Sequence, residues 1–484
     1  MLGTIGIGLA LALLMYLAYR GVSVLLLAPV CAVLAALLSG APLLASYTQI
    51  FMKSLGNFIV LYFPLFLLGA LFGKLMEASG SARSIAHRIV SALGRDRAIL
   101  AIVLACAILT FGGVSLFVVA FAVYPIAAAL FQEAAIPKRL VPGTIALGAF
   151  TFTMTALPGT PAIQNAIPMP FFDTTPFAAP GLGVIGGLVM FGAGMAWLQR
   201  RLQAARARGE GYGDVEPWLP PVPRRQSGEH AQGNDVVEIG SMVTPVREQA
   251  LPGFVSALAP VVSVVALNYA FAIVVIPALD TSYLAEPAYG ATTVASVKGI
   301  WAIVGALTLS CLLVVALNRT MLTDLKQTLD DGAGAAVLPI FNTASLVGFG
   351  AVVAALPAFA EIRDAVLAIA PGNPLISLSI AVNVLAGITG SASGGMSIAL
   401  QTLGDTYLAM GRAAGIAPEL LHRVTAIATG GLDALPHNGA VITLLSICKL
   451  THREAYADIF AVAVIVPILA LVAVVLLGTT FGSF

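Results

Sequence analysis

The sequence predicts an all-α polytopic membrane protein, and three observations carry this prediction: composition, long apolar runs and motifs that occur twice. Of 484 residues, 59% are hydrophobic and 10% are charged, and the mean hydropathy is +0.97. Soluble domains carry roughly a quarter charged residues. Apolar runs at 3–19, 22–38, 299–317 and 458–478 match the roughly 17–25 residues that a helix needs to cross a bilayer. We therefore expect several membrane-spanning helices.

Several other classes of protein are disfavoured. The first apolar run has no basic residue before it and a second run follows directly, so we expect a retained span rather than a signal peptide. Cys31, Cys106, Cys311 and Cys448 are solitary and predict neither disulfides nor a metal site. The net charge is +1, and no basic run interleaved with aromatic residues indicates nucleic acid. No cofactor is expected.

A polar segment divides the chain into two parts of similar size. Residues 199–250 hold seven arginines, seven acidic residues and several prolines, which predicts a solvated, disordered linker. It separates a first membrane domain at 1–198 from a second at 251–484.

Short motifs of the first half recur in the second in the same order and at nearly the same offset. The paired strings are ALPGTPAI at 156–163 and ALPHNGAV at 434–441, GGVS at 112–115 and GGMS at 394–397, and FPLF at 63–66 and LPIF at 338–341. Such self-similarity indicates a duplication.

The distribution of basic residues predicts that the duplication is inverted. Cytoplasmic loops carry the excess of Lys and Arg, and arginines concentrate in 77–97 and in the linker. Counting spans from these segments places the N-terminus in the periplasm. The helix at 57–76 then runs inward, while its counterpart at 334–356 runs outward. Inverted repeats with broken helices are typical of secondary transporters, whose substrate site lies near the membrane midplane.

Two glycine-rich breaks predict re-entrant hairpin tips, because glycines interrupt otherwise apolar helical segments. At membrane depth the freed backbone groups are tolerable only when they are buried in protein or line a wet cavity. The alternative is that small residues merely let helices pack closely. The candidate substrate-binding residues at these tips are Gly112, Gly113, Ser115, Ser393, Gly394, Gly395 and Ser397.

Two proline-containing breaks predict helix starts that face a substrate. Thr160 stands at a predicted N-cap position before Pro161, and Asn438 takes that position in the second half. The amides of a helix start suit a carboxylate, whereas a plain proline kink is the structural alternative. The candidate substrate-binding residues here are Gly159, Thr160, Gln164, Asn165, His437, Asn438 and Thr443.

Titratable groups occur in the second break alone. Asp433 and His437 face Thr155 and Gly159 in the aligned first half. Ionisable residues within membrane segments usually mark ion or proton pathways, and an imidazole exchanges protons near neutral pH, so both residues are candidates for proton coupling. Alternatively, they cap a helix end and bond a carbonyl. Arg423 is interpreted as an interfacial anchor.

These strings carry a family resemblance. FGGVSLFVVAFAVYPIA at 111–127, TALPGTPAIQNAIP at 155–168 and GGLDALPHNGAVITLL at 430–445 resemble the gluconate:proton symporter (GntP) family of the ion-transporter superfamily, and the third resembles its 3-hydroxybutyrate-permease branch. The resemblance implies an inner-membrane location, a scaffold and a transport domain of elevator type, a homodimer and proton-coupled symport of a small organic acid.

The sequence therefore predicts a secondary transporter of a small hydroxy-monocarboxylate, similar to 3-hydroxybutyrate, embedded in membrane lipid. A sugar acid such as gluconate is the alternative substrate. Sodium coupling is the alternative driving force, because unwound carbonyls and hydroxyls ligate Na⁺ without titratable groups. An enzyme is disfavoured because no catalytic or nucleotide motif is present, and a channel because no continuous polar face is present.

Overall fold

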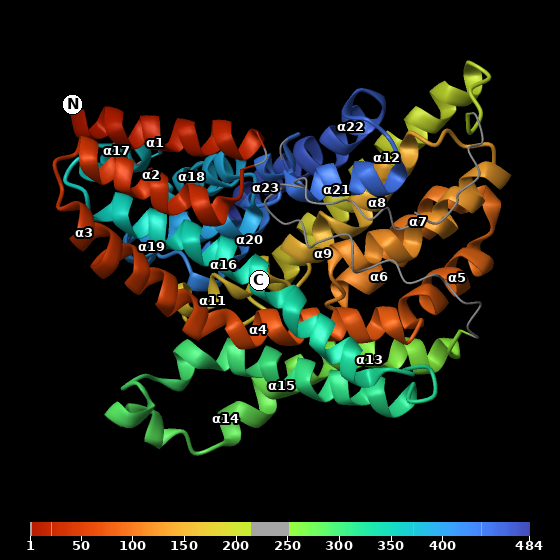
Figure 1. The fold of residues 1–484 in the computed structure, drawn as a ribbon, viewed down its shortest axis with the longest axis horizontal. Helices are drawn as coiled ribbons and strands as arrows, with labels where there is room; N and C mark the ends of the chain where they lie inside the picture. The colour runs from red at the N-terminus through yellow and green to blue at the C-terminus, as the bar shows by residue number, and fades with distance from the viewer. Residues whose placement is uncertain (1, 21, 214–250, 371, 437) are drawn as a thin grey trace.

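The computed structural model describes residues 2–20, 22–213, 251–370, 372–436 and 438–484, and every regular element within them is a helix (Figure 1). Seven helical segments of this described part are long and apolar enough to cross a membrane: Leu43–Ala78, Leu116–Glu133, Pro180–Ala207, Phe254–Ala278, Val294–Leu317, Leu325–Ala355 and His452–Phe481. Shorter apolar helices accompany them. The prediction of an all-α polytopic membrane protein is confirmed.

The helices of the first half follow one another in a regular order. They are α1 (Leu2–Tyr19), α2 (Val24–Leu38), α3 (Leu43–Ala45), α4 (Met52–Ala78), α5 (Ser81–Leu93), α6 (Ala98–Phe111), α7 (Leu116–Glu133), α8 (Leu140–Ala149), α9 (Phe152–Thr155), α10 (Ile163–Ala166), α11 (Met169–Phe172) and α12 (Pro180–Ala207). A π-helical stretch at Ser46–Phe51 joins α3 to α4 without a break.

The helices of the second half have a closely similar order. They are α13 (Phe254–Ala270), α14 (Ile276–Ala278), α15 (Val294–Leu317), α16 (Leu325–Ala355), α17 (Phe359–Leu367), α18 (Pro374–Thr389), α19 (Ala392–Ala413), α20 (Pro418–Ala428), α21 (Gly439–Cys448), α22 (His452–Phe460) and α23 (Val466–Phe481). Two π-helical stretches, at Phe271–Val275 and Ala461–Ile465, continue α13 into α14 and α22 into α23.

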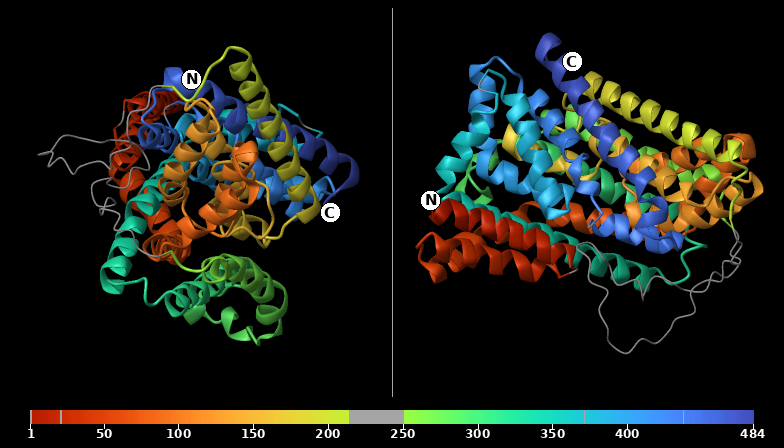
Figure 2. Two further views of the ribbon diagram at one scale, coloured as in Figure 1. Left: turned by 90° about the vertical axis from the view of Figure 1, so that its right-hand side faces the viewer. Right: turned by 90° about the horizontal axis from the view of Figure 1, so that it is seen from above.

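The two longest helices, α4 and α16, pack against each other and form the centre of a framework. Helix α2 packs on α16 and helix α15 packs on α4, so each half covers the long helix of the other. Helices α1 and α13 complete the framework by packing on α2 and α15. Figure 1 and the left view of Figure 2 show α13 and α15 along one edge of the molecule.

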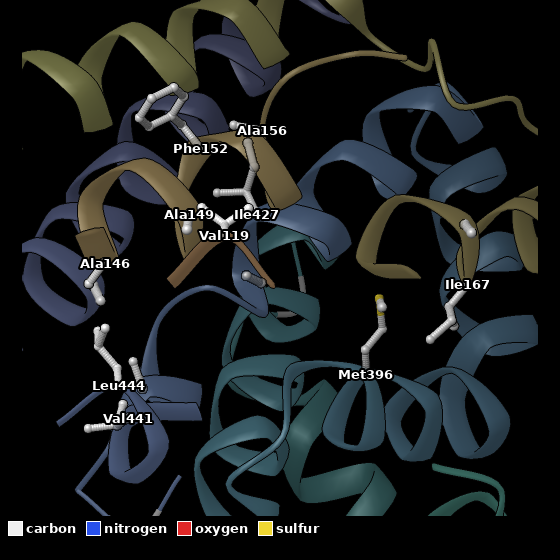
Figure 3. Close-up of a cluster of buried hydrophobic side chains, with 14 of the residues drawn as sticks. Val119, Ala146, Ala149, Phe152, Ala156, Ile167, Met396, Ile427, Val441 and Leu444 are labelled. Atoms are coloured by element: carbon white, nitrogen blue, oxygen red, sulfur yellow. The ribbon is translucent and has the colours of Figure 1, made fainter. Parts of the chain in front are cut away.

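Two helical hairpins and two broken segments lie beside this framework. Helices α6 and α7 pack together, as do α18 and α19. The chain is broken between α9 and α10, and again between α20 and α21. Figure 3 shows Val119 and Ala146 of the first half in one apolar cluster with Ile427 and Leu444 of the second. The core therefore joins α7 and α8 of the first half to α20 and α21 of the second.

Helix α12 extends beyond the predicted boundary at residue 198. Residues 199–207 are its last turns, although their composition assigns them to the linker. Leu202 and Ala205 are buried, and the Arg201 guanidinium donates from Nε to the buried Asp458 carboxylate at 2.7 Å. Packing and an ion pair thus keep a charged sequence helical. Residues 214–250 lie outside the described residues, so the disorder of the linker stays a prediction.

Candidate functional site

The first predicted hairpin tip is a tight turn between α6 and α7. Gly113 has φ = 91°, which glycine adopts without strain. A Cβ on Gly113 would lie 2.9 Å from Cγ of Pro161, and one on Gly112 would overlap the Val261 side chain. Ser115 stands directly before the first residue of α7. The tip is therefore in contact with the first broken segment.

The first broken segment restarts its helix later than the sequence predicts. Helix α10 begins at Ile163 with Ala162 at the cap position, so the prediction that Thr160 caps the helix is wrong. Thr160 Oγ1 instead accepts a hydrogen bond from the Ala162 amide at 3.3 Å, and such a local turn competes with helical capping. The Asn165 side-chain amide donates to the carbonyls of Thr160 (3.0 Å) and Pro176 (2.9 Å).

Gly159 is held by internal hydrogen bonds on both sides. It has φ = 83°, and a Cβ there would overlap the ring of Phe177. Its amide donates to the Pro176 carbonyl at 2.9 Å, and its carbonyl accepts from Asn268 Nδ2 at 3.1 Å. A glycine is therefore required here by backbone conformation and close packing.

Arg423 lies at the centre of the contact between the two broken segments, so its interpretation as an interfacial anchor is wrong. Its side chain is fully buried. Nε donates to the Ala178 carbonyl at 3.0 Å, and Nη2 donates to Ala178 (2.7 Å) and Pro176 (3.3 Å). Nη1 donates to the Thr155 carbonyl (3.4 Å) and to Asn165 Oδ1 (3.2 Å). These five contacts match the five donors of a guanidinium.

His422 extends the same buried network. Its Nε2 lies 3.1 Å from Asn165 Oδ1, and its Nδ1 lies 2.6 Å from the Thr174 hydroxyl. Because an amide oxygen only accepts, Nε2 carries the proton and Nδ1 accepts from Thr174. The sequence signal that could have identified His422 and Arg423 is their position in α20, the helix that leads directly into the second break.

The second hairpin turns at Gly390 and Ser391, and α19 begins at Ala392, so the prediction that residues 393–397 interrupt the helix is wrong. Ser391 Oγ accepts from the Gly394 amide at 3.2 Å and lies 3.4 Å from Ser393 Oγ. Ser393 also lies 3.4 Å from the Thr343 hydroxyl of α16. A Cβ on Gly395 would overlap the backbone of α18. Close helix packing therefore accounts for Gly395, whereas the serines join the tip to the framework.

The second broken segment has the helix start that the sequence predicts. Asn438 is the N-cap of α21, and its Oδ1 accepts from the amides of Ala440 (2.6 Å) and Val441 (3.1 Å). Its Nδ2 donates to the Gly390 carbonyl at 2.9 Å, which ties this break to the second hairpin tip. These amides are engaged by protein groups, which leaves fewer donors for a carboxylate than the prediction assumes.

Asp433 is half-buried in the short 3₁₀ turn Leu432–Ala434. Its carboxylate accepts a backbone hydrogen bond from Ala434, and it forms no ion pair with another described residue. The turn is held from outside, because Asn383 Oδ1 accepts from the Leu432 amide at 3.2 Å and the Tyr456 hydroxyl donates to the Ala434 carbonyl at 3.1 Å. The other candidate for proton coupling, His437, lies outside the described residues.

Three predicted binding residues carry buried polar atoms without a hydrogen-bond partner in the described part of the chain. They are Gln164 (Oε1), Ser397 (Oγ) and Thr443 (Oγ1). Buried polar groups are nearly always paired, so an unpaired one calls for an explanation such as a missing ligand or water. The side chains of Asn165 and Asn438, in contrast, form their hydrogen bonds with other groups of the protein.

A cavity of about 240 Å³ lies beside these segments and contains none of the predicted residues. Four helices build it: α4, α11, α16 and α19. Its lining residues are Ser54, Asn57, Phe58, Leu61, Tyr62, Pro170, Phe171, Val347 and Gln401. The sequence signal for this cavity is the presence of Asn57 and Gln401 within helices that are otherwise largely apolar.

An α-helical membrane core with two paired hairpins and two buried chain breaks defines a membrane transport protein. Comparisons with known proteins agree. Residues 1–174 match the family described as GntP family permease. The chain is 47% identical over 463 residues to the "Uncharacterized transporter YxjC" of Bacillus subtilis (strain 168), covering 94% of this chain and 95% of that protein. The chain belongs to the GntP permease family, which confirms the resemblance.

Proposed function

We propose that this protein is a secondary active transporter that carries a small hydroxy-monocarboxylate into the cell together with protons. The observation that carries the proposal is the pairing of each hairpin tip with a break: Gly113 contacts Pro161, and the Gly390 carbonyl accepts from Asn438. Irregular backbone at membrane depth occurs where it is buried in protein or lines a cavity that serves transport. The two tips and two breaks form one crossover site in this proposal.

We further propose that the two halves are inverted repeats. The order of helices supports this, because α4 to α12 has the same sequence of long helix, short helix, hairpin, broken segment and final helix as α16 to α23. The packing is also reciprocal, since α2 packs on α16 as α15 packs on α4. The framework helices then act as a scaffold, and the hairpins with the broken segments move across the bilayer as an elevator. A homodimer, with the scaffold at its interface, suits this motion.

Proton coupling is assigned to the second break. Asp433 is a half-buried carboxylate without an ion-pair partner among the described residues, and His437 follows it in the sequence. A carboxylate that is neutralised when the substrate binds reduces the cost of carrying charge through the membrane. The membrane is the bacterial inner membrane, with the N-terminus in the periplasm and the linker in the cytoplasm.

The test is uptake of labelled 3-hydroxybutyrate into proteoliposomes under an imposed inward proton gradient. Accumulation above the equilibrium level is expected, and it should disappear when an ionophore collapses the gradient. Replacing sodium with choline separates the alternative coupling ion, because proton symport does not depend on sodium. Sodium-dependent accumulation that persists without a proton gradient would overturn proton coupling. Chemical conversion of the substrate would overturn the transporter itself.

A further inference from the structure

The cavity between α4, α11, α16 and α19 joins elements of both halves. The framework contributes Asn57 and Tyr62 of α4, and α11, which follows the first broken segment, contributes Phe171. The second hairpin contributes Gln401 of α19. The Tyr62 hydroxyl donates to the Ile167 carbonyl at 3.0 Å, so the cavity wall is tied directly to the first broken segment. A molecule in this cavity would touch the framework and the moving parts of the proposed transporter together.

The polar side chains in the cavity have no assigned role in the fold. Asn57 and Gln401 are exposed to the cavity and form no hydrogen bond with another described residue. Asn57 lies within Leu43–Ala78, a helical segment that is long and apolar enough to cross a membrane. Unpartnered amides within such segments are unfavourable unless they meet water or a ligand. Both side chains are therefore available to a polar molecule.

A polar row on α19 connects the cavity to the second hairpin tip. Ser393, Ser397 and Gln401 follow one another at intervals of four residues, which places them on the same face of a helix. Ser393 lies at the tip beside Thr343, and Ser397 Oγ is buried without a partner. The row leads from the predicted crossover site to the open end at Gln401. The cavity is thus a continuation of that site.

The remaining walls of the cavity are largely apolar. Six of the nine lining residues, Phe58, Leu61, Tyr62, Pro170, Phe171 and Val347, present aromatic or aliphatic surface, and no charged side chain lines the cavity. Its volume of about 240 Å³ is below the roughly 300–1,000 Å³ typical of sites for drug-sized ligands. This lining suits a short carbon chain with one hydroxyl group. A polyol would leave several hydroxyls facing apolar surface without hydrogen bonds.

We propose that this cavity is the specificity subsite for the carbon chain and hydroxyl of a short hydroxy-monocarboxylate, with Asn57 and Gln401 as the residues that read the hydroxyl. The inference rests on the proposed transport function and selects between the two substrate classes that the sequence leaves open. The apolar walls hold the alkyl end, and the carboxylate points along the α19 row towards Ser397.

The experiment measures thermal stabilisation of the purified full-length protein by 3-hydroxybutyrate and by gluconate over a range of concentrations. The variants are Asn57→Leu and Gln401→Leu. Gln132→Leu is the matched control, because Gln132 is an exposed amide at the end of α7, outside the cavity. We expect stabilisation of the unmodified protein by 3-hydroxybutyrate but not by gluconate. Each cavity variant should weaken the apparent affinity about tenfold, the value of one lost hydrogen bond of about 1.4 kcal/mol, and the control should not.

Several outcomes would contradict this inference. Unchanged 3-hydroxybutyrate affinity in both cavity variants would remove the cavity from the site while leaving transport intact, and stronger stabilisation by gluconate would assign the other substrate class. If the unmodified protein is neither stabilised by these acids nor able to carry them in proteoliposomes, the transport proposal itself fails. Elution of each variant at the volume of the unmodified protein in size-exclusion chromatography establishes that the variants are folded.

Discussion

The two broken segments differ in how their polar groups are satisfied. In the first, Asn165 bonds two carbonyls, Arg423 and His422, and Arg423 uses all five donors on the protein. In the second, Asn438 bonds two amides and one carbonyl, while the Asp433 carboxylate has only a backbone partner among the described residues. The polar side chains of the first break are therefore held by hydrogen bonds within the protein. In the second break, the Asp433 carboxylate is free to exchange a proton in the proposed coupling step.

This difference arises because Arg423, a cation of the second half, donates its hydrogen bonds to carbonyls of the first half. Arg423 and His422 lie on α20, yet the groups that accept from or donate to them lie between Thr155 and Ala178. A buried guanidinium is tolerable only when its donors are satisfied. We infer that the difference in sequence between the two breaks decides where the proposed coupling occurs.

The largest expected effect comes from removing the guanidinium. Arg423→Gln removes the donors of the buried Thr155 and Ala178 carbonyls, and each unsatisfied group costs about 1–3 kcal/mol. We expect loss of most of the stable protein, measured as a large fall in the thermal unfolding midpoint in detergent. The unfolding midpoint of Arg423→Lys, which has three donors instead of five, should lie between those of Arg423→Gln and the unmodified protein. Arg412→Gln, at an exposed arginine on α19, is the control, and equal midpoints for Arg423→Gln and Arg412→Gln would contradict the account.

A smaller effect is expected at the second break. Asn438→Ala removes the cap of α21, worth about 1 kcal/mol, together with the bond to the Gly390 carbonyl. Asn438→Asp keeps the acceptor for the amides and loses only the donor, so its unfolding midpoint should lie between those of Asn438→Ala and the unmodified protein. Equal destabilisation by both variants would mean that the tie to the hairpin, rather than the cap, dominates.

A third comparison separates binding from stability. Thr443 Oγ1 is buried without a partner, whereas the Thr144 hydroxyl donates to the Leu140 carbonyl at 2.8 Å. Thr443→Val should raise KM for uptake with little change in unfolding temperature. Thr144→Val should lower the free energy of unfolding by about 0.5–1.5 kcal/mol, and with it the unfolding temperature, without changing KM. If Thr443→Val destabilises the protein and leaves KM unchanged, Thr443 is a structural residue.

The smallest expected effect lies outside both breaks. Arg139 donates from Nε to Glu210 Oε1 at 2.6 Å, and this hydrogen bond lowers the pKa of Glu210 below its ordinary value. A lowered carboxyl pKa stabilises the fold at neutral pH, and this stabilisation is lost as the pH falls through the lowered pKa. Because the pair is partly exposed, Glu210→Gln should cost at most about 1 kcal/mol at pH 7. The difference in unfolding midpoint should shrink on acidification, and a difference that is constant with pH would exclude this origin.

The sequence predicted the membrane class, three of the four breaks and the cap at Asn438, because these depend on local composition and on glycine, proline and asparagine. It placed the second hairpin tip at 393–397, a few residues too late, because Gly394 and Gly395 serve close helix packing and lie within α19. It misplaced the start of α10 by assigning the cap to Thr160, because Asn165 of α10 is held by His422 and Arg423, which are far away in the chain. The interpretation of Arg423 as an interfacial anchor was also wrong, because the carbonyls that accept its hydrogen bonds, at Thr155 and Ala178, lie far away in the chain. The cavity was missed for the same reason: Asn57 and Gln401 meet only in the folded molecule.

Gradient-driven uptake by proteoliposomes containing Asp433→Asn shows most directly whether the proposed proton coupling resides in the second break. Asp405→Asn, at an exposed carboxylate of α19, is the matched control. We expect that Asp433→Asn abolishes accumulation driven by the proton gradient while exchange of labelled for unlabelled substrate continues, and that Asp405→Asn accumulates substrate normally. Undiminished gradient-driven accumulation in Asp433→Asn combined with His437→Ala would contradict the proposed coupling.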